Sequence, residues 1–348
     1  MTERENVSER EHGSHIWVNE IKENDRIHGL YLAKIKKSGT TKKGDPFLSI
    51  LLSDRTGDVE SRVWENAEEF SSIFKEGDIL EIEGHAGSYR NQIQLIISDM
   101  RAYDGNGDPT IFLESTAEDI AAMMKSLREL LKRLQDTHLK ALSESFLADH
   151  LFIKDFKKAP AAKNFHHNYV GGLLEHTLSV CRMSQIVAEQ YRELERDLLI
   201  TGAFLHDIGK IREFRYNRMI EYTDEGRLLG HLVMGISMVD EKLSKIKPFP
   251  MEKALRLKHL ILSHHGQYEF GSPKRPKFLE AFALHLIDDL DAKMNGLRRY
   301  MEKDNQEGAW TDFNRMFERY LLKNKLPEVE TRADYAKQDD RQKSLFMP

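Results

Sequence analysis

The sequence has very little of several features that whole classes of protein require. It contains a single cysteine, Cys181, in 348 residues, which excludes an intramolecular disulfide framework and a cysteine-based zinc module. That scarcity favours a reducing compartment, and we expect the cytoplasm. No run approaches the roughly 18 consecutive apolar residues that a membrane span needs, and residues 1–14 are charged without an apolar segment. We therefore expect neither membrane insertion nor secretion.

A surplus of positive charge is also missing. Lys and Arg number 52 and Asp and Glu number 57, so the formal net charge is −5. A protein that coats nucleic acid by bulk charge is disfavoured, although a local basic patch is not excluded. Histidine, by contrast, is abundant: eight of the 15 histidines lie between His166 and His265.

Breaks in the residue pattern divide the chain, which is long enough for two domains of about 100 to 200 residues each. Residues 1–14 are expected to form a solvated tail. Five β-rich runs follow in the region 15–104, with a short helix between the third and the fourth: 27–36, 46–53, 58–64, the helix 66–74, 79–87 and 91–99. This order is typical of an OB barrel, with another small β barrel as the alternative.

The Gly-rich and Asp-rich cluster 104–109 predicts a domain boundary. After it the apolar residues recur at helical spacing, and Thr116 with Asp119 forms a start signal of the capping-box kind. We expect a linker and helical hairpin over 105–157, and a C-terminal helix with a charged tail over 306–348. The predicted helices are 120–134, 139–152, 173–191, 197–208, 230–246, 252–264, 277–300 and 311–322. The fold class predicted is an N-terminal all-β OB barrel followed by an all-α domain.

Side chains that could bind a metal recur along these helices. They are His176, His206, Asp207, His231, His264, His265 and Asp288. If the chain turns near 192–196, His176 and His206 lie about 15 to 20 Å from that turn on antiparallel helices, at similar height. Asp288 falls in an apolar stretch, where a buried carboxylate is costly unless a cation offsets its charge.

Three motifs carry a family resemblance: Gly171–Thr177 (GGLLEHT), Leu205–Lys210 (LHDIGK) and Asp288–Ala292 (DDLDA). Together they resemble the HD superfamily of metal-dependent phosphohydrolases. An OB domain in front, with Phe165–Asn168 (FHHN) before the glycine pair, narrows the resemblance to the YhaM-type 3′-to-5′ exoribonucleases, over residues 16–305. The resemblance implies an HD phosphohydrolase domain over 158–305.

The resemblance also implies a set of ligands. It implies that His176, His206, Asp207 and Asp288 hold one ion, and that His231, His264 and His265 hold or border a second ion with Asp207 bridging. Imidazole and carboxylate suit borderline to hard ions. We expect one or two divalent ions, with manganese first and cobalt, iron or zinc as alternatives.

Divalent ions held by these residues would favour in-line hydrolysis of a phosphodiester bond. A divalent ion lowers the pKa of its bound water from 15.7 to about 7, and an ion pair about 3.5 to 4 Å apart can also stabilise the displaced oxygen. Asp207 is then a catalytic residue as well as a ligand. Lys210 could neutralise a phosphate oxygen or simply close a helix terminus. His167 could neutralise a phosphate oxygen, protonate the leaving oxygen or bond to the backbone.

The OB region offers basic and aromatic side chains for a single strand. Five lysines fall where the loop between the first two strands is expected, and could attract backbone phosphates: Lys34, Lys36, Lys37, Lys42 and Lys43. Candidate stacking platforms are Tyr31, Tyr89, Phe47 and Trp64, each able to contribute about 1 to 3 kcal/mol per base. A place in the barrel core is the alternative, and it is favoured for Phe47 and Trp64.

The leading hypothesis is a metal-dependent exonuclease that trims single-stranded RNA from its 3′ end, with single-stranded DNA as another substrate. Two alternatives stay open. One is a phosphohydrolase of nucleotides or cyclic dinucleotides, although no Gly-Tyr-Pro signature follows His231. The other is a nucleic-acid-binding protein whose helical domain is structural. No membrane partner is expected, and self-association through the helices in 119–152 is left open.

Overall fold

The computed structural model describes residues 15–89, 92–103, 112–217, 219–304 and 308–323. The chain divides into two compact units, Met1–Ala292 and Lys293–Pro348. The predicted tail at 1–14 and the predicted boundary at 104–109 lie outside the described residues. Of the helices in the described ranges, none is long and apolar enough to cross a bilayer.

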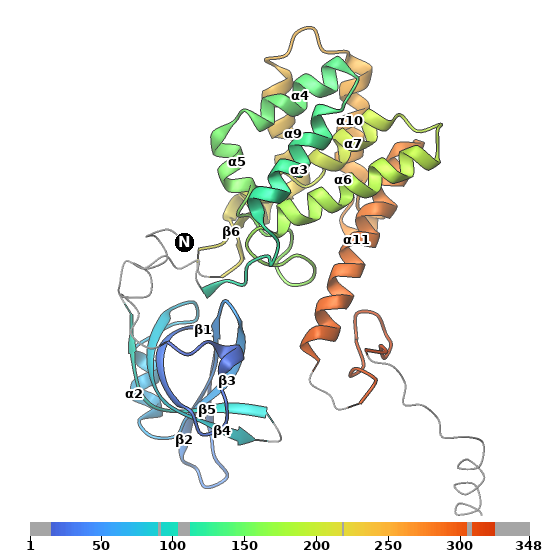
Figure 1. Cartoon of the computed structure of the whole chain (residues 1–348). Coiled ribbons are helices and arrows are strands. Elements are labelled where there is room, and N and C mark those ends of the chain that lie inside the picture. Colours follow the sequence, from blue (N-terminus) through green and yellow to red (C-terminus); the bar gives the residue numbers. More distant parts are fainter. Residues whose placement is uncertain (1–14, 90–91, 104–111, 218, 305–307, 324–348) are drawn as a thin grey trace, which may run out of the picture. The chain divides into compact units, whose positions relative to one another are not determined.

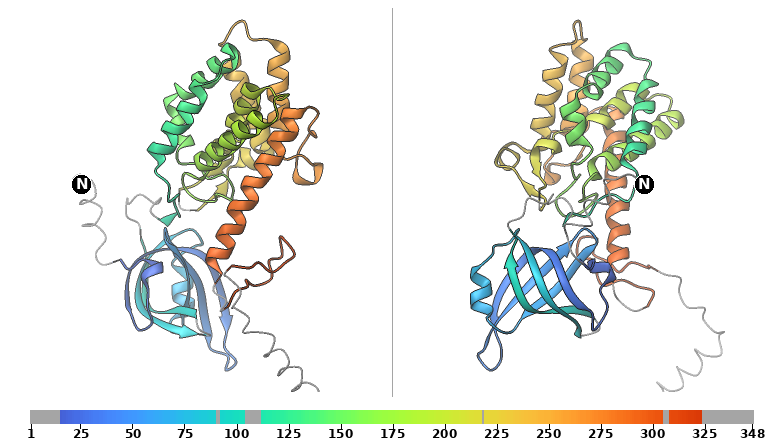
Figure 2. Two further views of the ribbon diagram at one scale, coloured as in Figure 1. Left: turned by 45° about the vertical axis from the view of Figure 1, so that its right-hand side comes forward. Right: turned by 60° about the vertical axis from the view of Figure 1, so that its left-hand side comes forward.

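The N-terminal part of the first unit is a closed five-stranded barrel, shown in Figure 1. Its strands are β1 (Arg26–Thr40), β2 (Pro46–Asp54), β3 (Gly57–Val63), β4 (Ile79–Tyr89) and β5 (Gln92–Ala102), and α2 (Ala67–Ser72) lies between β3 and β4 in sequence. The strand order is β1-β2-β3-β5-β4, and β3 pairs with β5 in parallel. The strands are tilted around the barrel axis (Figure 2), as closure requires. The OB expectation is confirmed.

The barrel core follows the two-residue alternation of a strand. On β2 the side chains of Leu48, Ile50 and Leu52 are fully buried, whereas the residues between them are partly exposed. Closure also needs a bend in β4, and the register shifts between Glu83 and Gly84. A Cβ at Gly84 would lie 2.3 Å from the carbonyl oxygen of Ile96, so only glycine permits this close approach of β5.

One buried carboxylate ties the start of the chain to the barrel. Asp54, at the end of β2, is fully buried and accepts the backbone N–H of Val18 at 2.7 Å. It also accepts the backbone N–H of Thr56 at 2.6 Å and that of Gly57 at 3.2 Å, and its Oδ2 lies 3.3 Å from Nε2 of His15. The carboxylate therefore fixes both the β2–β3 turn and η1 (Val18–Glu20).

The rest of the first unit is helical, apart from one short two-stranded sheet. Its elements are α3 (Ile120–Lys132), α4 (Thr137–Leu147), α5 (His150–Phe156), α6 (Gly172–Gln190), α7 (Arg196–Leu205), α8 (Lys210–Glu213), β6 (Phe214–Arg215), β7 (Glu221–Tyr222), α9 (Asp224–Leu243), α10 (Met251–Ser263), η3 (Tyr268–Phe270) and α11 (Leu279–Lys303). The helix α11 continues into the second unit. The prediction of a helical domain after the barrel is thereby confirmed, with the small sheet β6–β7 as an addition that the sequence did not predict.

Two helix predictions differ from the structure because of aspartate caps. The segment 139–152 is not one helix, because the Asp149 side chain accepts the N–H groups of Leu151 and Phe152 and begins α5 separately. The N-cap of α3 is Asp119 rather than Thr116, since Asp119 accepts the N–H groups at positions 121 and 122. A side chain that satisfies free N–H groups begins a helix wherever it lies.

The helix predicted at 311–322 is wrong. Isolated bridges join Trp310 to Leu322 and Asn314 to Arg319 instead. The side chain of Asn314 accepts the N–H groups of Met316 and Phe317, at 2.9 and 3.0 Å. Local side-chain bonds of this kind compete with helix formation, so a turn replaces the helix.

Candidate metal centre

The candidate ligands lie on five elements whose ends and faces converge. His176 is on α6, His206 and Asp207 follow α7 directly, and His231 is on α9. His264 and His265 follow α10, and Asp288 is on α11. The structure brings together all seven ligands that the sequence predicts, listed here as the groups whose ligand atoms lie within 4.8 Å of one another: His176, His206 and Asp288; His206, Asp207 and His264; His231, His264 and His265.

The first set of ligand atoms surrounds one point. The Nε2 atoms of His176 and His206 are 3.1 Å apart, and Oδ1 of Asp288 lies 3.1 Å from the first and 3.6 Å from the second. Oδ2 of Asp207 lies 3.5 Å from Nε2 of His176 and 3.3 Å from Nε2 of His206. Two imidazoles and two carboxylates thus direct one ligand atom each at the same small volume.

The other oxygen of Asp207 faces the second set. Its Oδ1 lies 3.5 Å from Nε2 of His231 and 3.5 Å from Nε2 of His264. Because its two oxygens face different groups of histidines, Asp207 has the arrangement of a bridging carboxylate.

These donors fit a divalent ion. Ligand atoms bound to one ion at about 2.0 to 2.2 Å lie about 3 to 3.5 Å from each other, close to the observed separations. Among the described residues, Oδ1 of Asp207 and Nε2 of His231 are buried and make no hydrogen bond. An unpaired buried polar atom costs about 1 to 3 kcal/mol, which a bound cation would offset.

Hydrogen bonds on the opposite ring nitrogens orient the histidines. Nδ1 of His206 bonds to the carbonyl oxygen of Ala203 at 2.8 Å, and Nδ1 of His264 bonds to that of Ile261 at 2.8 Å. Nδ1 of His176 lies 2.7 Å from Oδ2 of Asp291. A proton on Nδ1 leaves Nε2 as an acceptor, so each ring offers its lone pair to the centre.

Charge balance keeps both central carboxylates ionised. Burial alone would raise the pKa of Asp207, but Lys210 and His206 hold that pKa well below its usual value. His176 and His206 do the same for Asp288. Burial would lower the pKa of His206, but its carboxylate neighbours, Asp207 foremost, raise it to about 10. An ion bound at this position would have to displace any proton on Nε2 of His206, so its binding would weaken as the pH falls.

The structure places the two other predicted catalytic residues beside the ligands. Lys210 is buried, and its Nζ donates to Oδ2 of Asp207 at 2.6 Å. His167 is also buried, with Nε2 3.0 Å from Asp291 and Nδ1 3.0 Å from the hydroxyl of Tyr169. Both ring nitrogens of His167 thus contact side chains rather than the backbone, which was the alternative.

Glu213 is a site residue that the sequence reasoning missed. Its Oε1 accepts the backbone N–H of His231 at 3.0 Å and lies 3.1 Å from Nδ1 of the same residue. The backbone of Gly230 has φ 72° and ψ 161°, which interrupts α9 just before His231. Glu213 therefore both caps the second half of α9 and orients the ring of His231. The contact could not be predicted from sequence spacing, because Glu213 and His231 are 18 positions apart and lie on different elements.

The predicted nucleic-acid residues of the barrel separate into two groups. Tyr31 is wrong as a stacking platform, because it is fully buried and its hydroxyl donates to the carbonyl of Ile16. The lysines do not form one loop either, since β1 extends to Thr40. Lys34 is paired with Asp58 at 2.6 Å, and Lys36 donates to two carbonyl groups near the end of α2.

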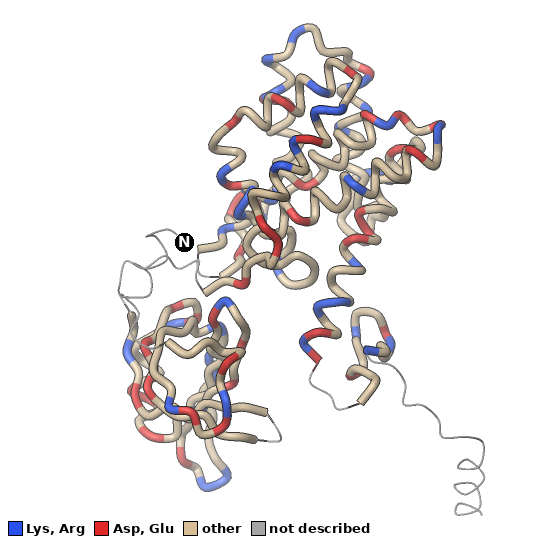
Figure 3. Tube along the Cα trace, in the orientation of Figure 1, with Lys and Arg blue, Asp and Glu red and all other residues tan. Residues whose placement is uncertain are grey.

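The remaining candidates face solvent. Lys37, Lys42, Lys43 and Tyr89 are exposed. Trp64, for which the core was favoured, is 48% exposed. Figure 3 shows basic residues at the turn that joins β1 to β2. Unlike Tyr31, these side chains are accessible to a single strand of nucleic acid.

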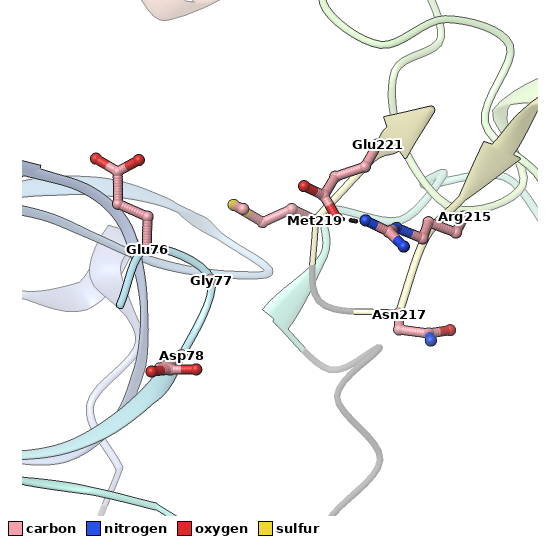
Figure 4. Close-up of a pocket in the computed structure, with 7 residues that line it drawn as sticks. All are labelled: Glu76, Gly77, Asp78, Arg215, Asn217, Met219 and Glu221. Carbon is pink, nitrogen blue, oxygen red and sulfur yellow. Dashed lines mark hydrogen bonds and ion pairs between the residues drawn. The ribbon is translucent and has the colours of Figure 1, made fainter. Parts of the chain in front are cut away.

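A separate pocket in the first unit contains none of the candidate ligands. Figure 4 shows its lining residues: Glu76, Gly77, Asp78, Arg215, Asn217, Met219 and Glu221. Arg215 is paired with Glu221 at 3.1 Å. With three acidic residues against one arginine, this pocket is unsuited to a polyanion.

Comparisons with known proteins match both parts of the chain. A family model described as an HD domain matches residues 173–293, and one described as an OB-fold nucleic acid binding domain matches residues 25–103. The chain is 32% identical to the 3′-5′ exoribonuclease YhaM of Bacillus subtilis (strain 168), over 80% of this chain and 88% of that protein. It is 35% identical to the 3′-5′ exoribonuclease YhaM of Geobacillus sp. (strain WCH70), over 80% and 86%.

Solved structures resemble the two parts separately. The second OB-fold domain of replication protein A from Methanococcus maripaludis matches with a TM-score of 0.23 and 19% identity, over 27% of this chain and 99% of that one. The HD domain of the L. monocytogenes phosphodiesterase PgpH matches with a TM-score of 0.29 and 19% identity, over 42% and 74%. These likenesses are too weak to carry an argument.

Proposed function

Because the chain belongs to the YhaM family of 3′-5′ exoribonucleases, we propose that it hydrolyses single-stranded RNA from the 3′ end in a metal-dependent reaction. Single-stranded DNA is a second substrate under this proposal. The barrel would bind the strand, and the helical domain would cleave it.

One observation carries the proposal. Asp207 is fully enclosed, and its two oxygens face two different groups of histidines at 3.3 to 3.5 Å. A shared carboxylate between two groups of imidazole ligands is suited to a pair of divalent ions. Ion pairs of this kind are used to cleave phosphodiester bonds.

The chain's own residues then have defined tasks. His176, His206, Asp207 and Asp288 would hold one ion, and Asp207 with His231, His264 and His265 a second, with manganese first among the candidate ions. When bound, such ions supply a water of pKa about 7 and positive charge for the phosphate oxygens. Lys210 keeps Asp207 ionised through its 2.6 Å contact.

His167 has a supporting task in this proposal. Its two ring nitrogens contact Asp291 and Tyr169, and Asp291 in turn contacts His176. We assign His167 to positioning Asp291, and through it the ring of His176, rather than to protonating the leaving oxygen.

The test uses 5′-labelled single-stranded RNA and DNA of the same sequence, each incubated with the full chain and Mn²⁺. A ladder of shortened products that is absent with His206→Ala and Asp207→Ala supports the proposal. The matched control is His150→Ala, which removes an exposed histidine of α5. No ladder, or a ladder that survives both ligand substitutions, refutes it. Parallel incubation with nucleotides and cyclic dinucleotides detects the small-molecule alternative.

A further inference from the structure

Two aromatic side chains lie together on the outer surface of the barrel. Phe47 is on β2 and Trp64 directly follows β3, and their ring centroids are 5.5 Å apart with an interplanar angle of 39°. The ring of Phe47 lies against Gly39 on β1, where an added Cβ would be 2.7 Å from Cζ of Phe47. The aromatic surface therefore spans three adjacent strands.

The fold of the barrel does not account for this surface. Leu48 and Val63, the chain neighbours of the two aromatic residues, are paired in register and fully buried, so the core is filled from the other face. Trp64 is 48% exposed, and Phe47 beside it is half-buried. Large exposed aromatic rings that contribute little to a core are typical of binding surfaces.

Cations flank the aromatic pair. The guanidinium of Arg62 lies 5.8 Å from the centroid of the Phe47 ring, and it is held by the hydroxyl of Ser49 and by Glu60. Lys37 is exposed and lies opposite Ser49 in the register of β1 and β2. An aromatic face beside positive charge matches the two parts of a single-stranded nucleic acid, an unstacked base and its phosphate.

We propose that Phe47 and Trp64 form a stacking platform that holds a base of single-stranded RNA on the barrel, with Arg62 and Lys37 beside the adjacent phosphates. The proposal rests on the proposed function in taking the substrate strand as the ligand. A duplex would bind weakly, because its bases are stacked on each other and do not present a face.

The test measures binding without cleavage. A 5′-fluorescein-labelled dodecamer of uridine is titrated with the full chain in EDTA, and its anisotropy gives the Kd. Trp64→Leu, which keeps an apolar side chain but removes the ring face, should weaken binding about 5- to 150-fold. Trp64→Phe should stay within about threefold of the unmodified protein, because base–aromatic stacking survives. The control is Trp310→Leu, since Trp310 is 49% exposed and belongs to the second unit, and it should leave the Kd unchanged.

Two results would overturn the platform: a Kd for Trp64→Leu within twofold of the unmodified protein, or an equal loss with Trp64→Phe. If Trp64→Leu does not fold, as judged by far-UV circular dichroism, the double variant Trp17→Phe/Trp310→Phe replaces it. Its remaining tryptophan fluorescence should be quenched by the RNA, and absence of quenching overturns the proposal.

The platform and the proposed function fail in different ways. If RNA is not cleaved but Trp64→Leu still weakens its binding, the exonuclease proposal fails and the platform stands. If RNA is cleaved but Trp64→Leu binds it as tightly as the unmodified protein, the platform alone fails.

Discussion

Removal of Glu213 should weaken one half of the metal centre and leave the other half intact. Its carboxylate makes two contacts with His231, to the backbone N–H at 3.0 Å and to Nδ1 at 3.1 Å. Each hydrogen bond to a charged group contributes about 1.5 to 3 kcal/mol, and loss of a residue that orients a ligand typically costs 10- to 100-fold in metal affinity. We expect Glu213→Ala to weaken one of two Mn²⁺ binding events by about that factor. Isothermal titration of the metal-stripped protein with Mn²⁺, together with metal content after dialysis, measures it.

Asp291→Ala provides the crossed control. Asp291 contacts Nδ1 of His176, which belongs to the other group, so this variant should weaken the other binding event. Glu241→Ala, which removes an exposed glutamate of α9, should change neither. The reasoning is refuted if Glu213→Ala weakens both events equally, or neither, while its circular dichroism spectrum matches that of the unmodified protein.

Three further predictions follow from residues outside the ligand set and from the ions themselves. Asp54→Asn should destabilise the barrel by about 1.5 to 3 kcal/mol in urea titrations at pH 7, because a buried ionised acceptor is lost. Burial opposes ionisation of Asp54, but its bonds to His15 and Thr56 prevail and lower its pKa, so this stabilisation is present above the ordinary carboxyl pKa of about 3.9 and is lost as the pH falls through the folded value. The difference in stability between the two proteins should therefore begin to shrink below about pH 4 and close at lower pH, and an unchanged gap at acidic pH would contradict this reading. Gly209→Ala places a Cβ 1.9 Å from the carbonyl oxygen of His231, so α9 has to shift, and metal content after dialysis should fall; full retention of metal would count against it. Dialysis against EDTA should abolish RNA cleavage and Mn²⁺ should restore it, whereas activity that persists in EDTA would argue against a metal-dependent reaction.

The sequence predicted the candidate metal centre better than it predicted the candidate nucleic-acid surface. Metal ligands are few in kind, and helical geometry alone brings His176 and His206 to the same height from the position of one turn. The grouping of the other ligands comes from the family resemblance. Glu213 could not be found in this way, because its contact with His231 depends on the interruption of α9 at Gly230 and on the path of β6 and β7.

The errors in the barrel have a common physical origin. A two-residue alternation shows which side chains share a face, but a one-residue shift of register exchanges the inner and outer faces. The sequence offers Tyr31 as a stacking platform and favours the core for Trp64, but in the structure Tyr31 is buried and Trp64 is 48% exposed. The prediction of a helix at 311–322 is wrong for a local reason. The side chain of Asn314 accepts hydrogen bonds from backbone amides that a helix would have used.

The scatter of the ligands along the chain has a consequence for the lifetime of the protein. Under the proposed function, one ion would join α6, the end of α7 and α11, and the second would join the end of α7, α9 and the end of α10. Each ion would be a reversible cross-link between segments that are far apart in sequence. Occupancy then adds to folding stability as free metal rises above its dissociation constant, by about 4 kcal/mol at a thousandfold excess. The supply of metal would then control the catalytic rate of the enzyme and also its resistance to proteases. A metal-starved cell would lose the protein as well as its activity.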